Sequence, residues 1–409
     1  ATGSLLTSAD VPIQQTATEN IGLGTNAVNS ITTGDYNVGV GNESGTAITT
    51  GSANTAIGRT SLSSNTTGSD NTALGKTALY NNTTASNNTA VGSTALAANT
   101  TGSNNTSVGM ESLISNTTGT EHAALGFQAL KSNTTGHSNV GIGNEALENN
   151  TTASSNTAVG TKSLRANTTA GHNTAVGNEA LKANTTGTNN VAVGSAALDA
   201  NTTGSGNVGI GVEALTVITT GSDNVADGQS ALEKTTTASN NTAMGKNALK
   251  ENTTGHSNVA VGRLALQSNT TGIRNVAVGE GALGSNLAGH TNTGIGHRAL
   301  AAFQGSAGEC TAVGTFSQYS NTSGPDNNSF GYDSLAQLTT GSYNCAFGNI
   351  SGDAITTGTY NVAIGQSAGG LITTGSYNVC VGPNAGAVTT GSNQLYIARS
   401  NANQGNNPV

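Results

Sequence analysis

The chain has 409 residues and a formal net charge of −8, and only 8% of its residues are charged. Ordinary globular domains carry roughly 25% charged residues, so this composition argues against the two or three such domains that the length would allow. The sequence contains no basic run and no stretch approaching the roughly 18 apolar residues of a membrane helix, so neither nucleic-acid binding nor a membrane span is expected.

Residues 1–19 carry no repeat, and we expect an N-terminal attachment or capping segment there. From residue 20 onward a glycine recurs at every seventeenth position from Gly24 to Gly296. One step that is a single residue longer leads to Gly314, and the regular spacing then continues to Gly382. The 22 copies share the consensus N-T-A-V-G-x-x-A-L-x-x-N-T-T-G-S-x, whose positions we number 1 to 17.

A 17-residue unit is too short for a domain but fits one coil of a parallel β-solenoid. The T-A-V-G segment predicts a short strand, N-T-T-G predicts a turn, and A-L at positions 8 and 9 predicts a second extended segment. An α-helical solenoid is excluded because a unit with four turn formers leaves no room for two helices. We therefore predict an all-β fold, a parallel β-solenoid or β-roll of about 22 coils.

Two sets of residues are predicted to stabilise the stack. Position 1 is Asn in 20 of 22 copies, and stacked Asn side chains form amide ladders. The predicted ladder residues are Asn71, Asn88, Asn105, Asn139, Asn156 and Asn173. We expect His122, which replaces one of these Asn residues, to interrupt the ladder. The core residues predicted from positions 4 and 9 are Val91, Leu96, Val159, Leu164, Val176 and Leu181.

Positions 1 to 5 are almost free of charge, which indicates that both faces of the strand are covered. One face can be the inside of the coil, and the other then needs a partner. We predict a homo-oligomer, with a trimer favoured; the alternative is a monomeric solenoid with a flat Ala/Gly face. Asp227 occupies the aliphatic position 4. We expect a local slip of the coil there; the alternative is that the Asp227 side chains of three chains meet water or a cation near the trimer axis.

The repeat varies along the chain. Residues 20–61 are interpreted as capping repeats, 62–300 as central regular repeats, 301–330 as irregular repeats, 331–400 as C-terminal variant repeats and 401–409 as a tail. Several flanking copies replace the position-9 Leu with Gly and place an aliphatic residue near position 12. Variant copies at the two ends of an array are typical of caps.

Tyr343, Tyr360 and Tyr377 are one coil apart and are predicted to form an exposed aromatic stripe that could bind sugar rings. The alternative is a ladder that only stabilises the stack. No catalytic pair or triad and no metal-binding spacing is found, so we expect a protein that is not an enzyme and has no cofactor.

The N-N-T-A-V-G step resembles the strand motif of trimeric autotransporter adhesin heads. Copies such as NTALGKTALYNNTTAS and NTAVGNEALKANTTGT resemble the repeats of bacteriophage tail-fibre proteins, particularly those of marine cyanobacterial phages. This resemblance implies a trimeric structural and adhesive fibre in the virion tail. Its implied partners are a glycan or protein of the host surface and, through the N-terminal segment, other virion proteins.

Two other functions are compatible with a solenoid of this kind. A bacterial adhesin head on the cell surface is the main alternative. An ice-binding solenoid is a weaker one, because the repeated Thr pair at positions 13 and 14 is adjacent and would point to opposite sides of an extended chain.

Overall fold

A computed structural model describes residues 19–306, 308–386 and 391–398. The chain divides into two compact units, Ala1–Gly204 and Ser205–Val409, which we call unit 1 and unit 2. The expected attachment segment, except for its last residue, and the expected tail lie outside the described residues. Each unit is a parallel β-solenoid, and no helix is present in the described parts.

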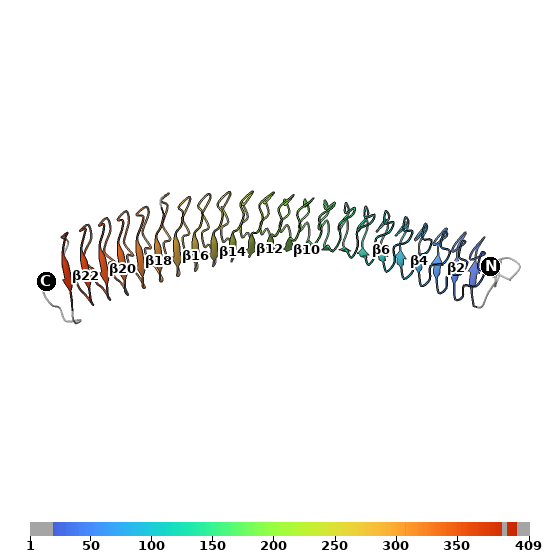
Figure 1. The fold of residues 1–409 in the computed structure, drawn as a ribbon, viewed down its shortest axis with the longest axis horizontal. Helices are drawn as coiled ribbons and strands as arrows, with labels where there is room; N and C mark the ends of the chain where they lie inside the picture. Colours follow the sequence, from blue (N-terminus) through green and yellow to red (C-terminus); the bar gives the residue numbers. More distant parts are fainter. Residues whose placement is uncertain (1–18, 307, 387–390, 399–409) are drawn as a thin grey trace, which may run out of the picture. The chain divides into compact units, whose positions relative to one another are not determined.

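Unit 1 contributes one short strand from each copy of the repeat (Figure 1). Neighbouring strands pair in parallel, as Thr89 pairs with Thr106 and Val91 with Val108. Equivalent positions therefore stack in register, which confirms the predicted solenoid. The strands of unit 1 are β1 Ile21–Leu23, β2 Val38–Val40, β3 Thr55–Ile57, β4 Thr72–Leu74, β5 Thr89–Val91, β6 Thr106–Val108, β7 Ala123–Leu125, β8 Val140–Ile142, β9 Thr157–Val159, β10 Thr174–Val176 and β11 Val191–Val193.

Unit 2 repeats this architecture with two changes of spacing. Thr293 pairs with Thr311, a step one residue longer than the usual period. Val379 pairs with Leu395, a step one residue shorter. The strands of unit 2 are β12 Val208–Ile210, β13 Val225–Asp227, β14 Thr242–Met244, β15 Val259–Val261, β16 Val276–Val278, β17 Thr293–Ile295, β18 Thr311–Val313, β19 Asn328–Phe330, β20 Cys345–Phe347, β21 Val362–Ile364, β22 Val379–Val381 and β23 Leu395–Ile397.

The second extended segment predicted at positions 8 and 9 is wrong, because these residues lie in a turn. In the coil that begins at Asn88, residues 93–98 form this turn. Thr94 and Leu96 have φ of 58° and 54°, so right- and left-handed residues alternate. Both left-handed residues donate to a neighbouring coil, Thr94 to the preceding one and Leu96 to the following one, while the Ala95 N–H between them donates within the coil. The hydrogen bonds offset the cost of left-handed backbone, about 1–2 kcal/mol per residue.

The core lies inside each coil and is narrow. Leu96, Leu164 and Leu181 are fully buried at position 9. The predicted core positions of Val91, Val159 and Val176 are wrong: within the chain these side chains lie on the outer face of the strand, and Val176 is 37% exposed. The middle residue of each strand points inward instead. Side chains alternate along a strand, and the Leu and Asn side chains leave room only for a small side chain, usually Ala, at position 3.

In the variant copies the large core side chain stands at position 12 and not at position 9. Where position 9 is Gly, as at Gly45 and Gly352, an Ile at position 12 fills the space, and a Cβ on Gly45 would lie 2.9 Å from Ile48 Cδ1. Ile48 and Ile355 are fully buried. The core thus tolerates either combination, because its total volume is preserved.

The irregular segment keeps the stack intact. Phe303 takes position 12 and is fully buried, and the small Cys310 takes position 1 of the next coil. The extra residue of the longer step lies between Phe303 and Cys310, and β17 and β18 still pair. Next to this segment, two buried side-chain amide atoms have no hydrogen-bond partner: Asn286 Oδ1 and Asn292 Nδ2.

Candidate functional site

The position-1 Asn residues form a buried column. Asn71 Nδ2 donates to Asn54 Oδ1 at 3.0 Å and to the Ala85 carbonyl at 2.9 Å, while the Asn88 backbone N–H donates to Asn71 Oδ1 at 3.1 Å. The column satisfies backbone donors that the short strands leave unpaired. The predicted ladder residues Asn71, Asn88, Asn105, Asn139, Asn156 and Asn173 are all fully buried in it.

His122 continues this column, so the expected interruption is wrong. Its backbone N–H donates to Asn105 Oδ1 at 3.0 Å, and its Nδ1 accepts the Asn139 N–H at 3.2 Å. Its Nε2 lies 2.7 Å from the Gly136 carbonyl, the place an Asn Nδ2 would take. This set requires a neutral ring with its proton on Nε2. Burial is the main cause that lowers the pKa of His122, to about 4.

A second amide column at position 12 was missed from the sequence. Asn99 Nδ2 donates to Asn82 Oδ1 at 2.8 Å and to the Gly102 carbonyl at 2.9 Å, and Asn116 Nδ2 continues to Asn99 Oδ1 at 3.0 Å. The N-T-T-G segment predicts only a turn, without a column of its Asn side chains from coil to coil. The signal was the recurrence of Asn at position 12 in nine consecutive copies, from Asn65 to Asn201.

Tyr343, Tyr360 and Tyr377 form a stacked ladder on the surface of unit 2. Their ring centroids lie 4.7 and 5.0 Å apart and the rings are nearly parallel, at 7° and 6°. The residues are 50%, 46% and 57% exposed. Since each ring face is covered by its neighbour, the ladder offers edges and hydroxyl groups to a ligand, and a broad aromatic face only at its ends. The Asp326 carboxylate raises the pKa of the Tyr343 phenol.

We call the outward side chains at positions 2 and 4 the strand face. At position 4 of unit 1 this face exposes Leu74 (43%) and Leu125 (47%), and in unit 2 it exposes Met244 (44%) and Ile364 (42%). Among the described strands only Asp227 brings a charge to it. The strand face therefore combines apolar side chains at position 4 with mostly Thr or Val at position 2, and the described residues of the chain leave it uncovered.

Asp227 does not disturb the coil. β13 stays in register, with Asp227 paired between Ile210 and Met244, so the expected slip is wrong. The residue is exposed because position 4 points outward. The isolated chain therefore pays no desolvation cost for this carboxylate.

The remaining chemistry of the described residues is sparse. None of their His, Cys, Asp and Glu side chains gather in groups of three or more that could hold a metal ion. Cys310, Cys345 and Cys380 are free thiols, and burial raises the pKa of Cys310 and of Cys380 to about 11, so both remain protonated. In the described residues no helix is long and apolar enough to cross a membrane.

The fold defines the chain as a β-solenoid repeat protein with a 17-residue coil. No protein-family model matches the chain, and no curated protein matches it.

Proposed function

We propose that this chain is a structural and adhesive fibre without enzymatic activity, a bacteriophage tail fibre or related virion appendage that contacts the host cell surface. The observation that carries the proposal is the unbroken hydrogen bonding between coils within each unit. The described coils of each unit are bonded to their neighbours through their strands and turns, and most of them also through Asn at position 1 or 12, which suits an element that must transmit force without unfolding.

The coil that begins at Asn88 illustrates this bonding. Besides the bonds within the strand ladder, eight of its backbone N–H groups donate to carbonyl oxygens of an adjacent coil. These donors are Thr89, Leu96, Ala98, Thr100 and Thr101 toward the following coil and Gly92, Thr94 and Asn104 toward the preceding coil. Because the bonds lie on all sides of the coil, opening one coil requires breaking them together. Each hydrogen bond contributes about 0.5–1.5 kcal/mol.

We further propose that three copies associate through their strand faces. Complete burial of a Val, Leu or Ile side chain removes roughly 60–120 Å² of apolar surface. At about 40% exposure, position 4 presents about 40 Å² per coil, or about 900 Å² over 23 strands. In a trimer each chain divides this area between two neighbours, about 450 Å² for each, whereas a stable interface buries about 800 Å² per partner, so the position-2 side chains of the strand face must contribute as well. A second copy also has the same spacing between coils, so contacts made at one coil can recur at the next.

The oligomer is tested by the mass of the native particle. We expect three times the chain mass of 40.1 kDa. Leu125→Lys places a charge on the strand face and should produce monomers, whereas Gln128→Lys, on the turn of the same coil, should leave the trimer intact. A stable wild-type monomer, or dissociation by both variants, would contradict this assembly.

The adhesive role is tested with labelled native particles on a panel of bacterial cells. We expect saturable binding to some strains and none to others, because recognition depends on a particular surface. Uniform absence of binding across strains, including the host of the source virus, would remove the adhesive part of the proposal.

A further inference from the structure

A groove of about 580 Å³ crosses the turn face of four consecutive coils in unit 2. It begins at Leu264 and Gln267 and ends at Tyr319, and Gly281 and Gly284 lie between them. Its lining comes from repeat positions 7, 10 and 11. The volume lies within the range of ligand pockets, roughly 300–1,000 Å³.

The groove exists because large side chains are missing, while the turn backbone keeps the same left-handed conformation at position 7 in all four coils. In the two coils before it, positions 10 and 11 carry the ion pairs Lys234–Glu251 and Lys250–Glu233. The two middle coils of the groove place Gly284, Ser285, Ala301 and Ala302 at these positions instead.

Gly281 shows that the fold does not require this gap. Its φ is 65°, but Leu264 and Arg298 occupy the same repeat position with φ of 62° and 53°. A Cβ on Gly281 would meet only Arg298 Cγ, at 3.4 Å. The backbone therefore accepts a side chain here, and its absence leaves open space beside Arg298.

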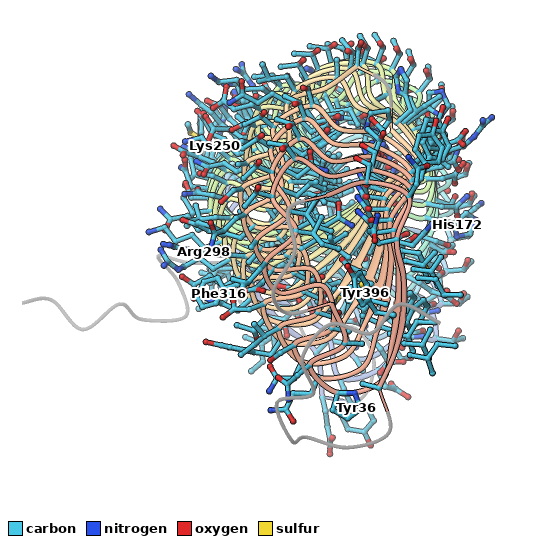
Figure 2. The ribbon with its side chains drawn as sticks, turned by 90° about the vertical axis from the view of Figure 1, so that its left-hand side faces the viewer. Tyr36, His172, Lys250, Arg298, Phe316 and Tyr396 are labelled. Atoms are coloured by element: carbon cyan, nitrogen blue, oxygen red, sulfur yellow. The ribbon has the colours of Figure 1, made fainter. Side chains whose placement is uncertain are left out.

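Arg298 supplies the only charge in the groove lining. It is exposed and, among the described residues, forms no salt bridge, whereas Glu280, the residue before Gly281, is paired with Arg263. Figure 2 shows Arg298 on the same side of unit 2 as Lys250 and Phe316, with its nitrogen atoms directed outward. A guanidinium in this setting is available for a carboxylate.

Tyr319 forms an aromatic wall that other rings hold in place. It packs edge-to-face on Phe316, with centroids 5.5 Å apart and an interplanar angle of 86°. Phe316 in turn contacts His297 at 5.2 Å and Tyr332 at 6.4 Å. Tyr319 remains 38% exposed, so a prearranged part of its ring and hydroxyl is open to a ligand.

We infer that this groove binds a short acidic saccharide, with a sugar ring against Tyr319 and a carboxylate on Arg298. Gln267, Ser268 and Ser285 offer hydrogen bonds to sugar hydroxyl groups. No Asp or Glu lines the groove, which argues against a cationic ligand. The inference rests on the proposed adhesive function and assigns it a ligand class, a uronic-acid-containing glycan of the host surface.

The test uses the full chain and a uronic-acid trisaccharide, with binding measured by calorimetry and ligand-observed NMR. Arg298→Gln and Gly284→Lys should each weaken binding about tenfold or more, the first by removing the charge partner and the second by filling the groove. Arg274→Gln removes an exposed guanidinium outside the groove lining and is the matched control, with unchanged affinity expected. The corresponding neutral trisaccharide should bind about tenfold more weakly.

The inference is overturned if the trisaccharide does not bind wild-type protein at about 10 mM, a concentration at which even weak ligands are detected. Equal losses in Arg298→Gln and Arg274→Gln, or equal binding of the neutral sugar, would also overturn it. Thermal melting of each variant checks the fold. If the sugar does not bind while the trimeric mass and adhesion to cells are observed, only the ligand assigned to the groove is refuted. If adhesion to cells is also absent, the proposed function is refuted as well.

Discussion

His122 makes the stability of unit 1 depend on pH in a way that one substitution should remove. Its Nδ1 accepts the Asn139 N–H at 3.2 Å, and this acceptor is lost when the ring takes a second proton. His122→Asn restores the residue found at position 1 in the neighbouring coils, whose Oδ1 accepts the same bond and does not titrate. The variant should therefore keep the column and lose the pH dependence.

The magnitude follows from the difference between the pKa of His122 when folded, about 4, and its ordinary value of 6.5. The unfolded chain binds the proton more readily, so unfolding becomes easier as the pH falls through the window between these values. At about 1.4 kcal/mol per pKa unit, the loss approaches about 3 kcal/mol below pH 4. Above pH 6.5 both states are neutral, and the contribution is fully retained.

Two measurements check this prediction. NMR titration of the His122 ring should give a pKa near 4, and hydrogen exchange of the Asn139 amide should accelerate between pH 6.5 and 4 beyond its intrinsic pH dependence. His122→Asn should abolish the acceleration, whereas His137→Asn, which removes an exposed imidazole nearby, should not. A His122 ring that titrates near 6.5, or identical exchange in wild type and His122→Asn, would refute the reasoning.

Urea unfolding monitored by circular dichroism should separate the inner and outer sides of one coil: Leu181→Ala should cost about 2–5 kcal/mol, and Val176→Ala in a dissociated chain less than about 1 kcal/mol. A similar loss of stability in both variants would show that Val176 is a core residue. Asn116→Ala leaves buried partners of the second amide column unpaired and should cost about 2–4 kcal/mol in the same assay; a cost below about 0.5 kcal/mol would make that column dispensable. Gly126→Ala should lower stability by about 3 kcal/mol or more, because its φ is 138° and the new Cβ would press on the backbone of the next coil. Gly281→Ala should be nearly neutral in thermal melting, and equal losses in the two alanine variants would show that Gly281 is required by the fold.

Much of the architecture could be predicted from the 17-residue repeat in the sequence. A glycine that returns at nearly every seventeenth position, a Thr-Ala-Val strand segment and a turn sequence predict stacked coils, because the coils repeat the same local preferences. The burial of Leu96 follows from its regular recurrence in a polar background, and the first amide column follows from the constancy of Asn at position 1. These features are local or strictly periodic, so they are visible without knowledge of the fold.

Which side of the strand points inward was decided only by packing. Alternation shows that Ala90 and Val91 face opposite ways but not which faces the core, and the larger side chain was wrongly placed inside. The space that remains beside Leu96 and the two Asn columns selects the alanine. The left-handed backbone of Leu96 was equally hidden, because isolated Leu avoids that conformation and only hydrogen bonds to the next coil stabilise it.

The groove and the tyrosine ladder are each formed by side chains of several neighbouring coils. The groove beside Arg298 joins small residues that lie one repeat apart, and the stacking of Tyr343 on Tyr360 covers the ring faces that the spacing alone left available. The sequence by itself determined the period and therefore the stack. The tertiary structure alone decided what each coil turns inward and outward, because that choice depends on the volumes and hydrogen bonds of the coils above and below.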